Sequence, residues 1–237
     1  MSKRAIILAG GTGTRLRPYT VVLPKPLMPV GDYPIIEVII RQLSHYGFDH
    51  ITITVNHKAE IIQAFLGNGS KWNIKIDYSL EDKPLSTMGP LKLIKDLPED
   101  FLVMNGDVLT DLNFEEFYNF HKDQGQLFSI AAKDRIEKSE YGVLDLNSDN
   151  FLTGFREKPE YHYTVSMGIY MTKKSVLDYI PDNTVFGFDH LMLRLLDQKQ
   201  PVLIHKHSGY WLDIGRPDDY IQAIDEFDQY KSKFIPE

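Results

Sequence analysis

The sequence predicts an α/β fold with a parallel β-sheet that is covered by helices on both faces. Short apolar runs typical of strands alternate along the chain with segments in which apolar residues recur at helical spacing. With 237 residues, 43% of them hydrophobic and 25% charged, the chain is long enough for one large domain with a substantial core. Ligands of such sheets bind beyond the carboxyl ends of the strands, where we expect the functional residues.

The elements follow one another in a regular order. The first strand is the apolar run at residues 5–8, and the glycines after it mark a turn. A turn cluster at residues 29–34 precedes a helix from Ile35 to Leu43 that ends near Gly47. Further strands are expected at 51–55, 74–78, 101–104, 128–132 and 201–204, with a hairpin-like section between 141 and 155. Further helices are expected at 59–66, 112–121, 176–180, 188–196 and 218–230, and a short one ends near Lys95.

The composition argues against several classes of function. A net charge of −7 without a basic block disfavours a nucleic-acid-binding surface. The absence of cysteine excludes disulfides, thiolate metal sites and a thiol nucleophile. The eight histidines lack metal-ligand spacing, and no Gly-x-Ser-x-Gly elbow of a hydrolase occurs. No segment approaches membrane-spanning length and the apolar run at the start is too short for a signal peptide, so we expect a cytoplasmic protein that binds neither membrane nor nucleic acid.

The glycine-rich stretch after the first strand is a candidate phosphate-binding loop. Glycine lets backbone N–H groups approach a phosphate closely, and Arg15 and Lys25 add positive charge in the same segment. A Walker A loop is excluded because Thr14-Arg15 follows Gly13, and a dinucleotide fingerprint is excluded because the motif closes on Leu16. A glycine-rich turn without a ligand is the structural alternative. The residues of this loop are Leu8, Ala9, Gly10, Gly11, Thr12, Gly13 and Thr14.

Asp107 follows the predicted strand at residues 101–104, at the same edge of the sheet as the glycine-rich loop. A carboxylate beside a bound triphosphate would repel it unless a divalent cation lay between them. Mg²⁺ is the usual cation, because it takes one or two carboxylates together with phosphate oxygens. The alternative is that Asp107 is a turn or helix-capping residue.

With Arg15 and Lys25 included, the opening stretch resembles the signature of the sugar-1-phosphate nucleotidyltransferases, also called nucleotide-sugar pyrophosphorylases. Their pattern is a strand, then Gly-Gly-x-Gly-Thr-Arg-Leu, then Pro-Lys-Pro. The resemblance covers residues 5 to about 220, with five motifs in the family order. It implies a Rossmann-like three-layer α/β/α fold with a mostly parallel mixed sheet, of the nucleotide-diphospho-sugar transferase type. We expect residues 1–237 to form a single catalytic domain.

The resemblance also implies roles for individual residues. Asp107 and Asp213 would bind Mg²⁺, the second within a Trp-x-Asp-Ile-Gly frame, although Asp213 could instead neutralise Arg216 locally. Glu157 would bind sugar hydroxyls and Lys158 the sugar phosphate, although a Glu-Lys pair on a loop is more often an exposed charge pair. The other implied contacts are Glu81, Gly89 and Gly106 for the nucleotide, and Gly142 and Ser166 for the sugar phosphate.

The base-binding region of this family reads Pro-Leu-Gly-Thr-Ala-Gly. Here Ser86 and Met88 replace the usual glycine and alanine, whereas the continuation Pro90-Leu91 resembles the guanylyltransferases that make GDP-mannose. For Glu81, contact with the base or ribose and a solvated loop carboxylate are both open.

Near the sugar, Ser166 replaces the usual asparagine of an Asn-x-Gly-Ile-Tyr strand at residues 165–170. A hydroxyl donates one hydrogen bond where an amide donates two, so the sugar hydroxyl that is recognised can differ.

The implied reaction joins an NTP to a sugar-1-phosphate and gives an NDP-sugar and pyrophosphate. Arg15 would contact the departing pyrophosphate, Lys25 the nucleotide phosphates and Lys158 the incoming phosphate. GTP with mannose-1-phosphate or a manno-heptose-1-phosphate is the expected pair. Cytidylyl, thymidylyl or uridylyl transfer to another sugar or non-sugar phosphate is the alternative, and a non-catalytic regulator that binds nucleotide sugars is another. A homodimer through Asp32, Tyr33 and the closing helix is one option for the quaternary structure.

Overall fold

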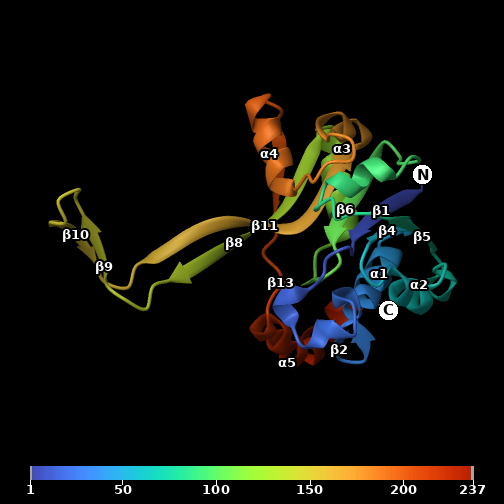
Figure 1. The fold of residues 1–237 in the computed structure, drawn as a ribbon, viewed down its shortest axis with the longest axis horizontal. Helices are drawn as coiled ribbons and strands as arrows, with labels where there is room; N and C mark the ends of the chain where they lie inside the picture. Colours follow the sequence, from blue (N-terminus) through green and yellow to red (C-terminus); the bar gives the residue numbers. More distant parts are fainter. Residues whose placement is uncertain (1, 236–237) are drawn as a thin grey trace.

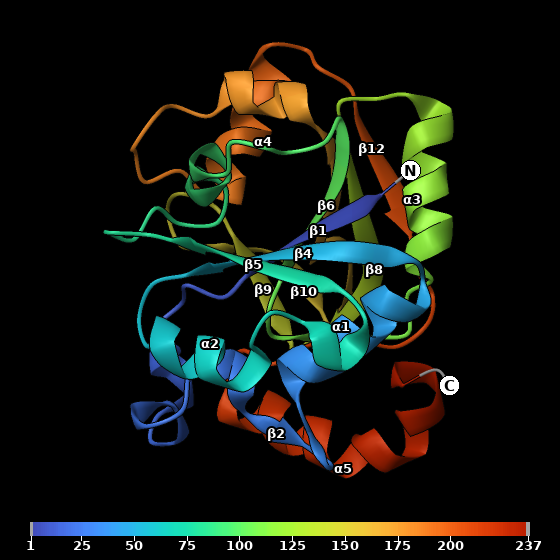
Figure 2. The same cartoon turned by 90° about the vertical axis from the view of Figure 1, so that its right-hand side faces the viewer.

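The computed structural model describes residues 2–235 of the protein. Its centre is a seven-stranded sheet (Figures 1 and 2). β11 runs antiparallel to both of its neighbours, and the other adjacent strands are parallel, so the sheet is mixed and mostly parallel. The strands in spatial order are β12 (Val202–Lys206), β8 (Phe128–Lys138), β11 (Glu160–Lys173), β6 (Asp100–Asn105), β1 (Lys3–Leu8), β4 (Phe48–Val55) and β5 (Lys75–Leu80).

Side chains of the central strands enter two cores, one on each face of the sheet. In β1, Ala5 and Ile7 join one core and Ile6 joins the other, because successive side chains of a strand point to opposite faces. The first core is covered by α1 (Ile35–His45), α2 (Ala59–Leu66), α3 (Phe114–Gln124) and α5 (Pro217–Phe234). The second is covered by α4 (Phe188–Asp197) and the 3₁₀ helices η5 (Gly89–Leu93) and η6 (Lys174–Tyr179). The three-layer α/β/α fold is thus confirmed (Figure 2).

Several element boundaries differ from those expected from the sequence. The helix expected at 112–121 begins at Phe114, because the side chain of Asn113 accepts a hydrogen bond from the amide of Glu116 at 3.0 Å and caps the helix there. The segments expected as helices at 176–180 and before Lys95 are the 3₁₀ helices η6 and η5. β7 (Val108–Thr110) and β13 (Trp211–Asp213) form an additional antiparallel pair, too short to be detected from periodicity.

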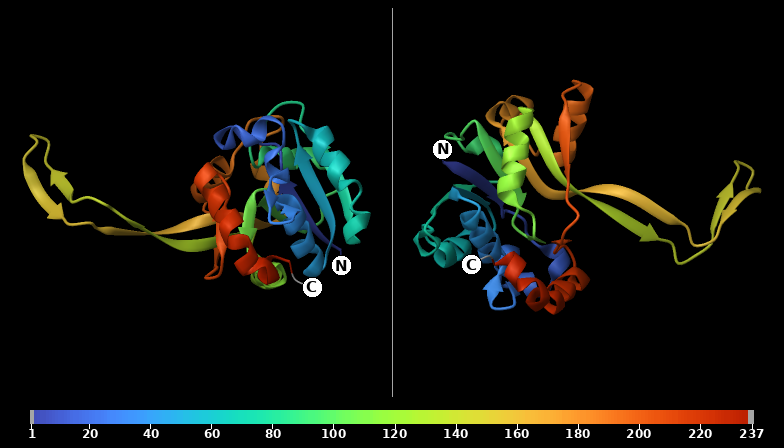
Figure 3. Two further views of the ribbon diagram at one scale, coloured as in Figure 1. Left: turned by 90° about the horizontal axis from the view of Figure 1, so that it is seen from below. Right: turned by 180° about the vertical axis from the view of Figure 1, so that it is seen from behind.

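The most unusual feature is an arm that projects from the sheet (Figures 1 and 3). β8 and β11 continue past the sheet as a two-stranded antiparallel ribbon, in which residues 133–138 pair with 160–165. Its tip is the hairpin of β9 (Val143–Leu146) and β10 (Leu152–Arg156). The sequence predicts the hairpin, but it predicts the end of the strand at residue 132 because the following residues are mostly charged and do not form an apolar run.

A short ribbon of β2 (Pro29–Val30) and β3 (Tyr33–Pro34) joins the glycine-rich loop to α1. The closing helix α5 packs against this region, where the hydroxyl of Tyr220 donates a hydrogen bond to the carbonyl of Pro29 at 2.8 Å. Between residues 2 and 235, none of the helices has the length and apolar character needed to cross a bilayer.

Candidate active site

The carboxyl ends of four parallel strands meet at one edge of the sheet. Leu8 of β1 pairs with Thr54 of β4 on one side and with Asn105 of β6 on the other. β5 joins this edge through the pairing of Val55 with Leu80. The glycine-rich loop, the segment at 105–107 and Glu81 therefore leave the sheet side by side, where parallel α/β sheets bind their ligands.

The glycine-rich loop is fixed at both of its ends. The amide of Ala9 donates a hydrogen bond to the carbonyl of Thr54 at 3.0 Å. Gly13 has a φ of +64°, in the left-handed region that favours glycine, and its carbonyl accepts a hydrogen bond from Thr20 Oγ1 at 2.7 Å. Lys58 Nζ holds the following turn through the carbonyl of Thr20 at 2.8 Å. The loop residues between these anchors include exposed positions that a ligand can reach, namely Gly11, Thr12 and Thr14.

Lys25 and Asp107 form an ion pair at the carboxyl ends of these strands. Lys25 Nζ donates to Asp107 Oδ2, and both side chains are largely buried. The other oxygen, Asp107 Oδ1, is buried without a hydrogen-bond partner. A buried carboxylate oxygen without a partner is costly unless a cation or donor reaches it. Asp107 therefore has an oxygen available to a further ligand.

β13 brings Asp213 beside Asp107. Asp213 pairs with Val108 across the β7–β13 ladder, and the amide of Ile214 donates to the carbonyl of Asp107 at 3.0 Å. Asp213 is exposed on one side, and the protein atoms on its other side partly desolvate its carboxylate and raise its pKa. The charge of Asp107 raises this pKa further, whereas Lys25 opposes the rise. This pair of carboxylates, one with a buried unpartnered oxygen, fits a cation such as Mg²⁺.

Protein ligands alone do not complete such a site. Within residues 2–235, no cluster of three or more histidine, aspartate or glutamate side chains is arranged to hold a metal ion. Mg²⁺ is commonly bound by one or two carboxylates together with waters and phosphate oxygens. The observed donor set matches that mode.

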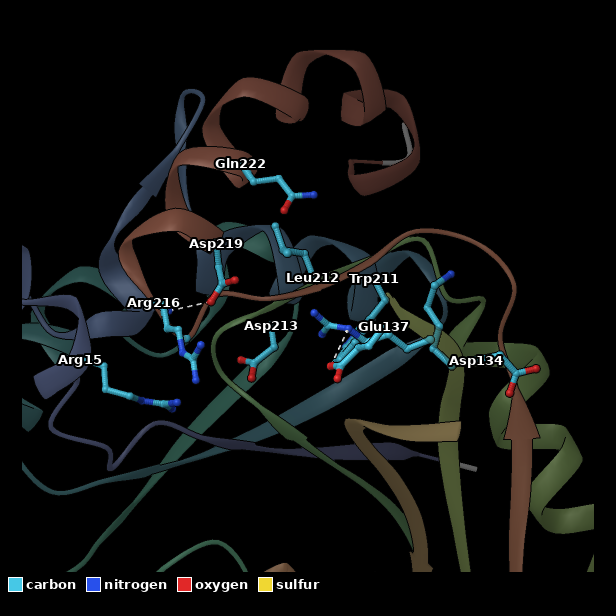
Figure 4. Close-up of a pocket in the computed structure, with 12 residues that line it drawn as sticks. Arg15, Asp134, Glu137, Trp211, Leu212, Asp213, Arg216, Asp219 and Gln222 are labelled. Carbon is cyan, nitrogen blue, oxygen red and sulfur yellow. Dashed lines mark hydrogen bonds and ion pairs between the residues drawn. The ribbon is translucent and has the colours of Figure 1, made fainter. Parts of the chain in front are cut away.

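Arg15 and Asp213 line a pocket of about 500 Å³ at the base of the arm (Figure 4). A Cβ atom placed on Gly215 would lie 3.6 Å from a terminal nitrogen of Arg15, so the guanidinium passes close to the backbone after Asp213. Arg216, expected from the sequence only as a local partner of Asp213, adds a further guanidinium to this pocket. The other lining residues come from β8, β13 and α5: Lys133, Asp134, Arg135, Glu137, Trp211, Leu212, Asp219 and Gln222.

Glu81 lies at the carboxyl end of β5 and is only 6% exposed. This burial does not fit a solvated loop carboxylate. Burial raises the pKa of Glu81, although its Oε2 also accepts a hydrogen bond from the amide of Leu85 at 3.0 Å. A Cβ atom on Gly10 would lie 2.6 Å from Glu81 Oε1, so this carboxylate faces the glycine-rich loop. Asn56, which belongs to none of the recognised sequence motifs, donates a hydrogen bond to the Glu81 carbonyl at 2.8 Å and fixes the segment.

The departures from the family motif at residues 86–89 have structural consequences. Met88 is fully buried in the second core, so it contributes packing rather than an exposed contact. Ser86 has a φ of +66°, a conformation that suits the usual glycine better than serine. Gly89 is buried where a Cβ atom would approach the Thr184 carbonyl to 2.9 Å, and Gly106 lies where a Cβ atom would be 3.0 Å from the Leu8 carbonyl.

Ser166 lies at a bulge in β11, next to the same edge. The Ser166 hydroxyl accepts a hydrogen bond from the amide of Gly168 at 3.2 Å and donates to the hydroxyl of Tyr170 at 3.3 Å. Gly168 has a φ of +74° and lies against the side chain of Asn105. Trp211 Nε1 donates to the carbonyl of residue 167 at 3.0 Å, which ties the bulge to β13.

The remaining predicted residues lie on the tip of the arm. Gly142, Glu157 and Lys158 are exposed there, and a Cβ atom on Gly142 would be 3.2 Å from Glu157 Oε2. These residues lie close to one another, and the end of the arm formed by β9 and β10 stands away from the body of the protein (Figure 1). Within residues 2–235 no hydrogen bond or ion pair joins them to Arg15 or Asp107. Their assignment to the sugar phosphate stays a prediction.

Comparison with known proteins gives matches to nucleotidyltransferases. A family model described as "Nucleotidyl transferase" matches residues 4–229. A mannose-1-phosphate guanyltransferase of Candida albicans is 35% identical, over 99% of this chain and 67% of that protein. A UTP–glucose-1-phosphate uridylyltransferase of Synechocystis sp. is 33% identical, over 93% of this chain and 62% of that protein. The chain thus spans 62–67% of the length of these two relatives.

A solved structure agrees with the fold. HddC from Yersinia pseudotuberculosis superposes with a TM-score of 0.72 at 27% identity, over 95% of this chain and 99% of that one. The structure of HddC complexed with GMP-PN superposes with the same TM-score at 26% identity. The likeness covers the three-layer fold as a whole.

Proposed function

Because the chain belongs to the nucleotidyl transferase family, we propose that it is an enzyme that joins an NTP to a sugar-1-phosphate and releases pyrophosphate. The observation that carries this proposal is the meeting of three features at one sheet edge. The exposed glycine-rich loop can receive phosphates, Arg15 and Lys25 supply positive charge, and the Asp107–Asp213 pair offers carboxylate oxygens to a cation.

The reaction needs no protein nucleophile. An oxygen of the sugar-1-phosphate attacks the α-phosphorus of the NTP and forms a new P–O bond, while the bond from the α-phosphorus to the β-phosphate oxygen breaks. Pyrophosphate leaves with that electron pair. The chain's contribution is to align the two phosphates and to stabilise the charge that develops on the leaving oxygens. Arg15 is assigned to the pyrophosphate, Lys25 to the nucleotide phosphates and Lys158 to the incoming phosphate.

Asp107 and Asp213 are the residues that would hold Mg²⁺. Bound Mg²⁺ supplies positive charge to phosphate oxygens and orients them. Lys25 forms an ion pair with Asp107, and the negative charge of Asp107 adds to desolvation, the larger effect, in raising the pKa of Asp213. Both carboxylates are therefore arranged to gain from a cation.

We favour GTP as the nucleotide and mannose-1-phosphate or a manno-heptose-1-phosphate as the acceptor. Support comes from the guanyltransferase of Candida albicans and from HddC, whose structure is complexed with GMP-PN. The uridylyltransferase of Synechocystis sp. has nearly the same identity, so uridylyl transfer is the first alternative to be tested. The buried carboxylate of Glu81 beside Gly10 is our candidate for contact with the base or ribose.

The test is pyrophosphate release from each of GTP, CTP, UTP, ATP and dTTP against a panel of sugar-1-phosphates, with and without Mg²⁺. We expect release with one nucleotide, above all GTP, and one manno-configured sugar. Asp107→Asn serves as the inactive variant, and Asp123→Asn, at an exposed position of α3, serves as its matched control. Release that continues at the same rate in Asp107→Asn would overturn the assigned mechanism.

Silence of the folded protein with every pair would reject the sugar-1-phosphate reaction. Nucleotide binding by calorimetry then distinguishes the remaining readings. Binding of a nucleotide sugar without turnover would indicate a regulator. Binding of a nucleotide together with turnover of a non-sugar phosphate would show that the acceptor is that phosphate and not a sugar-1-phosphate.

A further inference from the structure

The arm leaves the body of the protein as an isolated ribbon. β12 pairs with β8 only as far as Ala132, and β6 pairs with β11 only from Ile169 onward. Lys138 lies six positions beyond Ala132, so the ribbon carries its tip about 20 Å past the sheet at the usual rise of a strand. In the described part of the chain no strand of the body pairs with the ribbon beyond that point (Figures 1 and 3).

The tip carries large apolar side chains that nothing covers in the single chain. They are between 54% and 78% exposed and belong to neither of the two cores. A two-stranded hairpin is marginal on its own in water, and a cluster of exposed apolar residues usually marks a surface that binds another surface. These residues are Tyr141, Leu144, Leu146, Phe151, Leu152 and Phe155.

The tip also holds the two charged residues that are assigned to the sugar-1-phosphate. Glu157 and Lys158 sit beside Gly142 at the tip, whereas Arg15, Lys25 and the two aspartates lie on the body. The length of the ribbon is more than a lysine side chain can bridge. A site that combines the tip residues with the body residues therefore needs the tip of a second molecule, or a ribbon that folds back onto its own body.

The ribbon is built to stay extended. Its ladder runs without a register shift from Lys133–Val165 to Lys138–Glu160. Side-chain contacts support it, including the hydrogen bond of Thr164 to Asp134 at 2.7 Å. A bend within this stretch, which would bring the tip back onto the same body, would break the ladder, whereas reaching a second molecule would not.

We propose that two copies of this chain exchange their arms, so that Glu157 and Lys158 of one copy complete the sugar-phosphate end of the other copy's site. The proposal rests on the function proposed above for the roles of these two residues. Exchange of an identical element is a low-cost route to a symmetric dimer, because each copy gives and receives the same segment. A second copy also offers an apolar surface beside its own Arg15, in the exposed turn of Tyr19, Val21, Val22 and Leu23.

The first test measures mass in solution by light scattering coupled to size exclusion. The wild-type chain of 27.4 kDa is expected to elute with twice that mass. In the test variant, residues 139–159 are replaced by Asn-Gly, a two-residue turn that can join the facing positions Lys138 and Glu160. We expect this variant to elute as one chain.

A second variant keeps the full arm and changes only its apolar surface: Leu144→Ser, Phe151→Ser and Phe155→Ser together. It should also be monomeric. Its matched control is Leu193→Ser with Leu196→Ser on α4, where both leucines are 67% exposed, and this control should stay dimeric. A monomeric wild type would overturn the exchange. A dimer that survives either change of the tip would also overturn it and would point to another surface such as Asp32 and α5.

The second test asks which body each tip serves. Asp107→Asn and Lys158→Ala chains with different tags are co-expressed, and the mixed dimer is purified through both tags. With exchanged arms, one of its two sites has an intact Asp107 from one chain and an intact Lys158 from the other. The mixed dimer should then recover half of the wild-type pyrophosphate release, while each variant alone shows almost none.

The two tests separate the two proposals. Mixed dimers as inactive as their parents, with an active wild type, would show that each arm serves its own body and would overturn the exchange. A wild type that is silent in the substrate panel would reject the proposed function instead, and the mass measurements would still decide whether the arms hold two copies together.

Discussion

The ammonium group of Lys25 contacts the carboxylate of Asp107 although 82 positions separate them in the sequence. Lys25 stands in the 3₁₀ turn η3 (Lys25–Leu27) after the glycine-rich loop, and Asp107 follows β6. They meet because β1 and β6 are adjacent parallel strands, so the segments that leave their carboxyl ends lie side by side. The phosphate-binding and cation-binding parts of the proposed site are thus joined by one ion pair.

Replacing Asp107 by asparagine is expected to lower kcat by about 100-fold or more, since a charge-stabilising group is lost from the reacting phosphates. The fold should persist, because the asparagine carbonyl can still accept a hydrogen bond from Lys25. Pyrophosphate release as a function of Mg²⁺ concentration, together with the melting temperature, measures both effects. Asp123→Asn should match the wild type, and a fully active Asp107→Asn would remove Asp107 from the site.

Two glycines with the same backbone conformation test the phosphate loop. Gly13 has φ +64° and ψ +25°, and Gly125 at the end of α3 has φ +62° and ψ +17°. Alanine at Gly125 meets open space and should cost about 1 kcal/mol for the left-handed backbone alone. The Cβ atom of alanine at position 13 would in addition lie 2.9 Å from Thr20 Cγ2, which would displace the loop. The nucleotide affinity measured by calorimetry should therefore fall at least tenfold in the Gly13 variant and stay unchanged in the Gly125 variant. Equal nucleotide affinity in both variants would argue against the phosphate role.

Glu81→Gln separates binding from stability. The buried carboxylate is penalised by desolvation, which raises the pKa of Glu81, so the neutral amide should leave the melting temperature unchanged or slightly higher. If Glu81 contacts the base or ribose, the nucleotide Kd should rise about tenfold, because hydrogen bonds to a charged acceptor are the stronger ones. Calorimetric titration of GTP gives the Kd, with the exposed Glu60→Gln of α2 as control. An unchanged Kd would assign Glu81 to the loop structure alone.

Much of the fold follows from local patterns in the sequence. The helix at 59–66 is found with the expected bounds, because its apolar spacing and the glycine after it act together. The loop after β1 and the aspartate after β6 are also found, since a strand end followed by glycine or a carboxylate is a local signal. The contact of Lys25 with Asp107 then follows from parallel pairing of those strands.

The arm could not be predicted in the same way. Residues 133–138 are mostly charged, and their strand is stabilised by pairing with 160–165 rather than by an apolar face. The family resemblance assigns Lys158 to the site as a prediction, but it carries no information on the direction of the ribbon that holds this residue. The close approach of the Glu81 carboxylate to Gly10 could not be predicted from the sequence either, because it depends on the adjacency of β5, β4 and β1.

His121 in α3 should make the stability depend on pH. Its side chain is fully buried, and burial lowers the pKa of His121, an effect that nearby Asp100 only partly opposes. As the pH falls below 6.5, the unfolded chain therefore takes up a proton on His121 before the folded chain does. The contribution of neutral His121 to the free energy of unfolding is thus complete above pH 6.5 and is lost as the pH falls toward the lowered pKa of the folded state. Urea unfolding between pH 7.5 and pH 5 should show the wild type losing more free energy of unfolding than His121→Gln. The exposed His162→Gln should follow the wild type, and parallel profiles for wild type and His121→Gln would contradict this account.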